Sequence, residues 1–229
     1  MIGELVILWT DGLIFLLLLF ALVFGIYASR REHLRGPWRQ VARSRVGVST
    51  LVVLAFYVVV GLLDSIHFHP LIPSGEEGKK VQSGEVISLF DQLVTPLRER
   101  NEKTYSAPLA THLYAKETIE LADGSVIRDY PRLQFGGAHL ENPQADWAGD
   151  VLKLSLVGMV KGLLVTLVVG NILLALLAGR RGKGFGEVAR AILWGRTAVP
   201  WRAVLVTLGL LLILMMMAIE LSTGYHLLG

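Results

Sequence analysis

Four long runs of apolar residues, each interrupted by few charges, predict four helices that cross a membrane. Each run holds about 20 residues, which is the length that a helix needs to span about 30 Å of hydrocarbon. The second run is rich in β-branched valine, but a run this long can satisfy its backbone hydrogen bonds in lipid only as a helix. The predicted spans are residues 9–28, 46–66, 159–178 and 203–221.

The polar connections between these runs differ in charge, and the difference predicts which side of the membrane each occupies. Residues 29–45 and 179–202 are strongly basic, with only Glu32 and Glu187 opposing. An excess of Lys and Arg marks cytoplasmic connections, so we expect both termini and residues 67–151 on the opposite side. The first run has no preceding Lys or Arg and is too long for the apolar core of a cleavable signal peptide, so we expect it to remain as a span.

The long polar middle, residues 65–151, is the part of the chain whose composition is typical of a soluble protein. It contains eight Lys or Arg and thirteen Asp or Glu, so it is net acidic in a chain of formal net charge +3. Apolar residues at spacings of three and four predict a helix over residues 84–97. Ser83 is the expected N-cap of this helix, and Pro96 limits its C-terminal end.

Two further signals predict the rest of this polar middle. Asp123-Gly124 separates the short stretches 118–121 and 126–128, and this dipeptide favours the tight turn of a β-hairpin. Asn142-Pro143 places an N-cap residue before a proline at the first helical position, so a helix is expected to begin there and to continue into the third span. That helix is longer than the bilayer is thick, and its first turns are expected to lie outside the hydrocarbon.

Together these patterns predict a mainly α integral membrane protein. Residues 1–66 and 152–229 form two transmembrane hairpins, and residues 67–151 form a small α+β extracytoplasmic domain between spans two and three. A short surface helix is expected around residues 187–194. Aromatic residues near the span ends are expected as interfacial anchors: they are Trp9, Tyr27, Trp147, Trp201 and Tyr225.

Composition excludes several kinds of chemistry. The chain has no cysteine, so disulfides, thiolate nucleophiles and cysteine-ligated metals are ruled out. The sequence pI of about 9.3 does not indicate nucleic-acid binding, because the basic residues flank the apolar runs, where cytoplasmic retention explains them. We therefore expect membrane lipids, and no nucleic acid, among the partners.

Four ionisable residues lie on the four predicted spans, near the outer edge of the hydrocarbon: Asp11, Asp64, Lys161 and Glu220. Ionisable groups in spans usually face protein or water, so these four are a candidate outer-rim polar cluster at a translocation entrance. In the alternative interpretation each side chain reaches the nearby interface, with Lys161 paired to Asp11 or Glu220.

Catalytic and metal sites have weaker signals. His67 and His69 fall on one side of an extended segment, and two further histidines, His112 and His139, lie in the same polar middle; a metal site there lacks supporting ligands, and solvated interfacial histidines are the favoured interpretation. Ser106, with His112 and Asp129, lacks the surroundings of a nucleophile. The glycine-rich residues 182–186 do not end in the Gly-Lys-Ser/Thr of a phosphate loop. We expect no enzyme activity, cofactor or metal.

Several tracts resemble a known permease family. They are Thr104-Tyr105-Ser106-Ala107-Pro108-Leu109-Ala110-Thr111-His112-Leu113-Tyr114, Asp129-Tyr130-Pro131-Arg132-Leu133 and Gly136-Gly137-Ala138-His139-Leu140. On these tracts the chain resembles the N-terminal part of the inner-membrane permeases of binding-protein-dependent peptide ABC transporters, in the branch with an enlarged periplasmic insertion. In that family a stretch like Tyr225-His226-Leu227-Leu228-Gly229 leads directly into Thr-Asp-x-x-Gly-x-Asp-Val and the transport core.

The resemblance covers essentially the whole chain, but only the N-terminal extension of the family. The cytoplasmic Glu-Ala-Ala-x-x-x-Gly loop that docks on the ATPase is not matched: Glu187-Val188-Ala189 begins similarly, but Leu193 stands at the glycine position. We therefore expect either a part of a permease or a separate accessory subunit, and the position of Gly229 does not decide between them.

The resemblance implies a bacterial inner-membrane subunit for import of peptides or similar solutes. Its expected partners are further permease subunits, an ABC ATPase and a periplasmic solute-binding protein. The outer domain would dock this binding protein or cap the translocation path. A stand-alone scaffold or assembly subunit of another bacterial envelope complex fits the same topology and remains the alternative.

Overall fold

The computed structural model describes residues 2–73, 80–82, 84–98, 107–120 and 124–225. Its contacts divide the chain into two compact units, which are described separately. The first unit contains residues 1–95 and 190–207, and the second contains residues 96–189 and 208–229. The polar middle of the sequence is thus shared between the two units.

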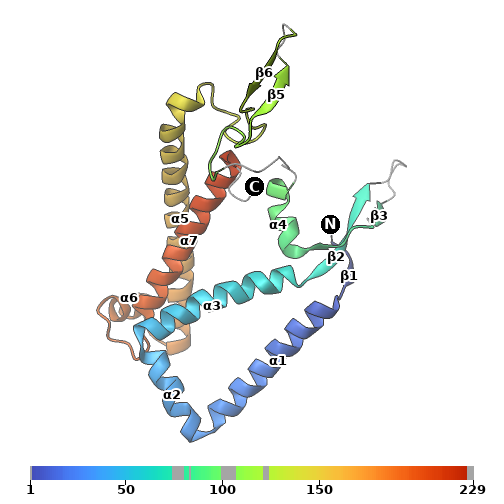
Figure 1. Ribbon diagram of the computed structural model, residues 1–229. Helices are drawn as coiled ribbons and strands as arrows, with labels where there is room; N and C mark the ends of the chain where they lie inside the picture. Colours follow the sequence, from blue (N-terminus) through green and yellow to red (C-terminus); the bar gives the residue numbers. More distant parts are fainter. Residues whose placement is uncertain (1, 74–79, 83, 99–106, 121–123, 226–229) are drawn as a thin grey trace. The chain divides into compact units, whose positions relative to one another are not determined.

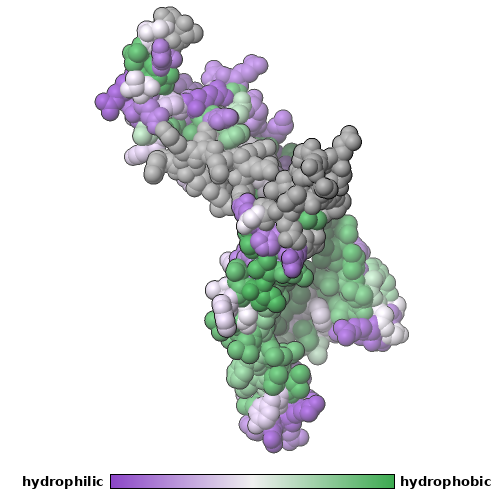
Figure 2. All heavy atoms as spheres, turned by 90° about the vertical axis from the view of Figure 1, so that its right-hand side faces the viewer, coloured by the Kyte–Doolittle hydropathy of each residue, from purple (hydrophilic) through white to green (hydrophobic). Residues whose placement is uncertain are grey.

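Within the described residues, four helices are long and apolar enough to cross a membrane, in agreement with the four predicted spans. Only 6–11% of the residues in their most apolar windows are buried by the protein itself, so most of their hydrophobic surface requires an apolar environment. Figure 2 shows hydrophobic side chains along these helices and hydrophilic side chains at helix ends. The helices are α1 (Trp9–Arg30), α3 (Arg45–Asp64), α5 (Pro143–Arg181) and α7 (Trp201–Gly224).

Helix α5 begins at Pro143 with Asn142 as its N-cap residue, as the sequence predicts. It is 39 residues long and runs without interruption through the third predicted span. It ends where Gly182 adopts a left-handed conformation with φ of +60°, which favours glycine. The predicted surface helix follows as α6 (Phe185–Leu193), starting two residues earlier than expected.

In the first unit the basic connection after α1 is itself helical. Helix α2 (Glu32–Arg43) has no buried residue and includes Pro37 within its length. The sequence predicts only a cytoplasmic connection over residues 29–45, so this helix is an addition. Ser44 ends α2 and caps α3, because its hydroxyl accepts a hydrogen bond from the Gly47 amide at 3.3 Å.

The sheet of the first unit has β2 (His67–Pro73) at its centre. Strand β2 pairs antiparallel with β1 (Ile2–Val6), β3 (Lys80–Gln82) and β4 (Ile87–Ser88) (Figure 1). The extended conformation expected for the two-histidine segment is confirmed. Strand β1 was not predicted, and it joins the N-terminal residues to the segment that follows α3. Phe68, only 1% exposed, forms the core of this sheet.

Helix α4 (Leu89–Arg98) starts later than the predicted helix over residues 84–97. The reason is local: the Ser88 hydroxyl accepts from the Asp91 amide at 2.9 Å, and the Ser88 amide donates to Asp91 Oδ2 at 3.1 Å. This reciprocal capping box fixes the first turn after Ser88. The prediction of the helix start was therefore wrong, and the expected cap, Ser83, lies outside the described residues.

In the second unit the predicted hairpin is confirmed. Strands β5 (Glu117–Glu120) and β6 (Val126–Asp129) pair antiparallel over four residues each. Gly124 in the connection has φ of +78°, the conformation that a tight turn requires of glycine. Asp123 lies outside the described residues.

The close approach of α5 and α7 dominates the second unit (Figure 1). A Cβ atom added at Gly158 would lie 2.6 Å from Cα of Met217, and one added at Gly162 would lie 2.6 Å from Cα of Ile213. One turn further along α5, Thr166 Oγ1 donates to Gly162 O at 2.7 Å and lies 3.4 Å from Gly209 O. Small residues four apart let two helix backbones meet in lipid. This contact of Gly158 and Gly162 with α7 was not predicted from the sequence.

We predict that Gly162→Ala destabilises the protein, although alanine is the better helix former. The new methyl group meets backbone atoms of α7, and such overpacking costs about 1–3 kcal/mol. Gly170→Ala is the matched control, because a Cβ atom at Gly170 meets no atom within 4 Å. It is expected to be neutral or to stabilise α5 by up to about 1 kcal/mol. The free energy of unfolding in mixed detergent micelles measures both, and equal effects of the two substitutions would contradict the glycine contact.

Candidate functional site

The four ionisable residues predicted at the span ends all have defined partners. Asp11 is 2% exposed in the first unit. Its Oδ2 accepts a hydrogen bond from the Leu8 amide at 3.0 Å and lies 2.9 Å from Nδ1 of His67. The carboxylate therefore joins the start of α1 to the first residue of β2, and it gives His67 a structural role.

Asp64, the last residue of α3, makes a similar contact. Its Oδ1 accepts a hydrogen bond from the hydroxyl of Ser88 at 3.1 Å. Ser88 is fully buried and also caps α4. The last residue of α3 is thus connected to the first turn of α4.

Lys161 and Glu220 form an ion pair between α5 and α7 in the second unit. This is one of the two pairs considered for Lys161 from the sequence. An ion pair between two helices of membrane-spanning length compensates two charges that would be costly in lipid. Asp11 and Asp64 thus belong to one unit, and Lys161 and Glu220 belong to the other.

A polar assembly in the second unit contains the tracts that carry the family resemblance. We call residues 107–114 and 129–140 the Arg132 module. The first tract (residues 107–114) and the second tract (residues 129–133) are joined by two backbone hydrogen bonds. They run from Leu113 N to Pro131 O at 2.8 Å and from Leu133 N to Thr111 O at 3.0 Å. The module begins at Ala107, because Thr104, Tyr105 and Ser106 lie outside the described residues.

Arg132 connects the second tract to the third tract, residues 136–140. Its guanidinium donates to the carbonyl of Gly137 at 3.1 Å and also to the carbonyl of Leu140. Gly137 has φ of +64°, and an added Cβ would lie 2.7 Å from Thr111 Cγ2. The tract can therefore adopt this path only with glycine at position 137.

Three contacts fasten the Arg132 module to the ends of α5 and α7, and a fourth joins the two helix ends to each other. The Gly137 amide donates to Gly224 O at 2.8 Å, and Trp147 Nε1 donates to Leu109 O at 2.8 Å. The other two meet at one carboxylate on α5. Asp150 Oδ2 accepts from the hydroxyl of Tyr225 at 2.8 Å and lies 2.7 Å from His139 Nε2.

Tyr225 lies at the centre of this attachment. Its side chain is fully buried, and its ring meets the His139 ring edge-on, with centroids 6.0 Å apart. Burial, together with the hydrogen bond to Asp150 and the charge of that carboxylate, raises the pKa of the Tyr225 phenol above its usual value. Tyr225 therefore remains a hydrogen-bond donor over the physiological range. It was expected as an interfacial anchor, and the structure instead places it inside the protein.

The side chains of this assembly hold backbone segments in place and leave part of its surface exposed. Among the described residues, no group of three or more His, Asp or Glu side chains could hold a metal ion. Nδ1 of His112 lies 3.0 Å from the hydroxyl of its neighbour Thr111, while Ser106 lies outside the described residues. A groove of about 450 Å³ opens beside the module; its lining residues are Ala107, Ala110, His112, Leu113, Tyr114 and Tyr130.

Comparisons with known proteins give no family assignment. No protein-family model matches the chain, and neither the curated proteins nor the solved structures include a significant match.

We predict that Tyr225→Phe lowers the free energy of unfolding by about 1–3 kcal/mol at neutral pH, because it removes a buried hydrogen bond to a carboxylate. The wild-type advantage should shrink as the pH rises above about 10, where the phenol ionises in the unfolded chain but stays protonated in the folded one. Unfolding in micelles between pH 8 and 11 measures this slope. Tyr114→Phe, at a side chain 76% exposed, is the control and should follow the wild type. An identical pH slope for Tyr225→Phe and the wild type would refute the assignment.

Proposed function

We propose that the chain is a membrane subunit, or the N-terminal part, of an ABC permease that imports peptides or similar solutes. In this proposal the polar region between α3 and α5 docks a solute-binding protein or covers the translocation path. The observation that carries the proposal is the Arg132 module. Three separate tracts that resemble the permease family fold against one another and against the ends of α5 and α7.

The position of Tyr225 supports a role in organising a transport core. Tyr225 is the first residue of the stretch that, in the family, leads directly into the core. The same residue is held by Asp150, while Gly224 before it accepts a hydrogen bond from Gly137. The module would thereby fix the direction in which the chain enters the core, and ATP hydrolysis would be left to partner subunits.

The groove beside the module supports a docking role. Tyr114 is 76% exposed and Tyr130 is 46% exposed, and both line the groove. Exposed tyrosines are enriched at protein interfaces, because the ring gives apolar contact and the hydroxyl gives a hydrogen bond. The proposed occupant of this surface is the solute-binding protein.

The proposed orientation predicts a pattern of cysteine labelling, for which a chain without native cysteine is well suited. Thr118→Cys on β5 should react with a membrane-impermeant maleimide in intact spheroplasts. Gln40→Cys on α2 should react only after the membrane is permeabilised, because basic connections stay in the cytoplasm. Both positions are exposed, so accessibility within the protein does not separate them. The reverse pattern would overturn the orientation.

The transport proposal predicts that affinity-tagged chain from its source membranes carries an ABC ATPase and a solute-binding protein in stoichiometric amounts. Arg132→Ala should reduce ATP-dependent uptake of labelled di- to hexapeptides at least tenfold while the chain still inserts, since the module loses its central donor. Arg128→Ala, at an exposed arginine of β6, is the charge-matched control and should retain uptake. Co-purification of a respiratory or secretion complex, with uptake unchanged in Arg132→Ala, would favour the scaffold function instead.

A further inference from the structure

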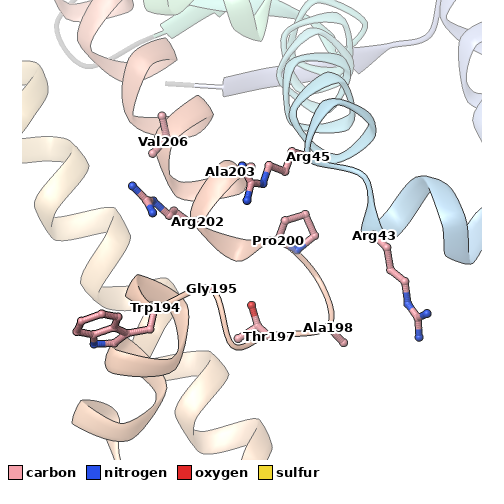
Figure 3. Close-up of a pocket in the computed structure, with 10 residues that line it drawn as sticks. All are labelled: Arg43, Arg45, Trp194, Gly195, Thr197, Ala198, Pro200, Arg202, Ala203 and Val206. Carbon is pink, nitrogen blue, oxygen red and sulfur yellow. The ribbon is translucent and has the colours of Figure 1, made fainter.

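The first unit contains a basic cavity of about 560 Å³ at the start of α3 and α7 (Figure 3). Arg43 comes from the end of α2, Arg45 from the start of α3 and Arg202 from the first turn of α7. The residues that line the cavity include these three arginines and no acidic residue. Within the described part of the chain, none of the three forms a salt bridge with a carboxylate. Three arginines without a carboxylate partner therefore line the cavity, and in Figure 3 the side chain of Arg43 is directed away from those of Arg45 and Arg202.

Backbone groups add to this positive field. Helices α3 and α7 both begin at the cavity, at Arg45 and Trp201. The helix dipole is positive at this end, although the amides of Gly47, Trp201 and Ala203 already donate to Ser44 Oγ, Val199 O and Pro200 O. Both helix starts thus add to the positive electrostatic potential of the arginine side chains.

A hydrogen bond one turn further along fixes the distance between the two helices. The hydroxyl of Thr207 donates to Ser49 Oγ at 2.8 Å. Arg45 precedes Ser49 by four residues on α3, and Ala203 precedes Thr207 by four residues on α7. The contact therefore holds the two basic helix starts at a set separation.

Two further residues of the lining, Trp194 and Val206, present exposed apolar side chains. The Trp194 side chain is 73% exposed and that of Val206 is 54% exposed. Val206 follows Arg202 by four residues, so both lie on the same face of α7, with Val206 further into the apolar helix. The cavity thus joins a positively charged end to a hydrophobic surface that continues along a membrane-length helix. A small anion would fill only the charged end, whereas an amphiphile matches both.

We propose that this cavity binds the phosphodiester head group of an anionic phospholipid, with Arg45 and Arg202 as its principal donors and the acyl chains along Val206. Guanidinium groups suit phosphate oxygens because each presents two parallel N–H donors. Basic pockets between membrane helices are suited to anionic head groups. The proposal does not depend on a transport function. Inorganic phosphate shares the head-group chemistry, and the test separates the two.

Native mass spectrometry of the full chain in detergent, titrated with phosphatidylglycerol, phosphatidylcholine or inorganic phosphate, tests the proposal. Phosphatidylglycerol should bind at least tenfold more tightly than phosphatidylcholine. The double substitution Arg45→Gln with Arg202→Gln should remove this preference. Arg180→Gln with Arg181→Gln, which removes two exposed basic charges at the end of α5, is the control and should retain affinity within about twofold. Circular dichroism shows whether the double variant folds. The two single substitutions replace it in the test if it does not.

Two results would overturn the proposal. The first is an unchanged preference for phosphatidylglycerol in the folded double variant, which would show that the arginines do not bind the head group. If the double variant does not fold, an unchanged preference in both single variants would show the same. Displacement of the lipid by millimolar inorganic phosphate, with the same dependence on Arg45 and Arg202, would assign the cavity to free phosphate. Val206→Asn should weaken only lipid binding, and an equal loss of phosphate binding would contradict the predicted acyl contact.

Discussion

The backbone contact between α5 and α7 is the constraint on which the second unit depends. Apolar side chains gain little by leaving lipid for one another, so close packing must hold membrane helices together. Gly158 faces Met217 and Gly162 faces Ile213, a fixed antiparallel register in which four residues forward on α5 correspond to four backward on α7. Extending this register by two turns beyond Gly158 places Asp150 opposite Tyr225, where their hydrogen bond is found. The glycine contact within the apolar region thus determines which residues meet beyond it.

Ionisable residues near the ends of the long helices have a common use in this protein. Each attaches a polar segment or a second helix to the helix that carries it. Asp11 reaches His67 of β2, Asp64 reaches Ser88 before α4, and Asp150 reaches Tyr225. A carboxylate can accept several hydrogen bonds, so one side chain at a helix end can satisfy donors from more than one segment. The polar regions are therefore held by a few acids, from the buried Asp11 to the exposed Asp64, in addition to a small apolar core.

The features that the sequence could predict are those determined by neighbouring residues. A 20-residue apolar run has one stable conformation in lipid, and the Asp123-Gly124 turn signal lies between the two strands that it joins. Strand β1 was missed because its partner β2 lies about sixty residues away. Helix α2 was missed because strong basic charge suggested only a connection, and Pro37 argues against a helix. The attachment of Tyr225 was missed because an aromatic residue at a span end is usually an interfacial anchor, and its burial depends on the module folded over it.

The pairing of β1 with β2 has a consequence for biosynthesis. Val6 pairs with His67, so α1, α2 and α3 must all be made before the first strand finds its partner. At about 5–20 residues per second, ribosomes need roughly 3–12 seconds to make the intervening segment. In the proposed orientation β1 has by then crossed the membrane, and it waits there with unpaired backbone donors and acceptors, as an exposed strand edge does. In that orientation β1 has a longer wait for its partner than the strands that follow it, and during that interval it is open to chaperones and proteases of the outer compartment.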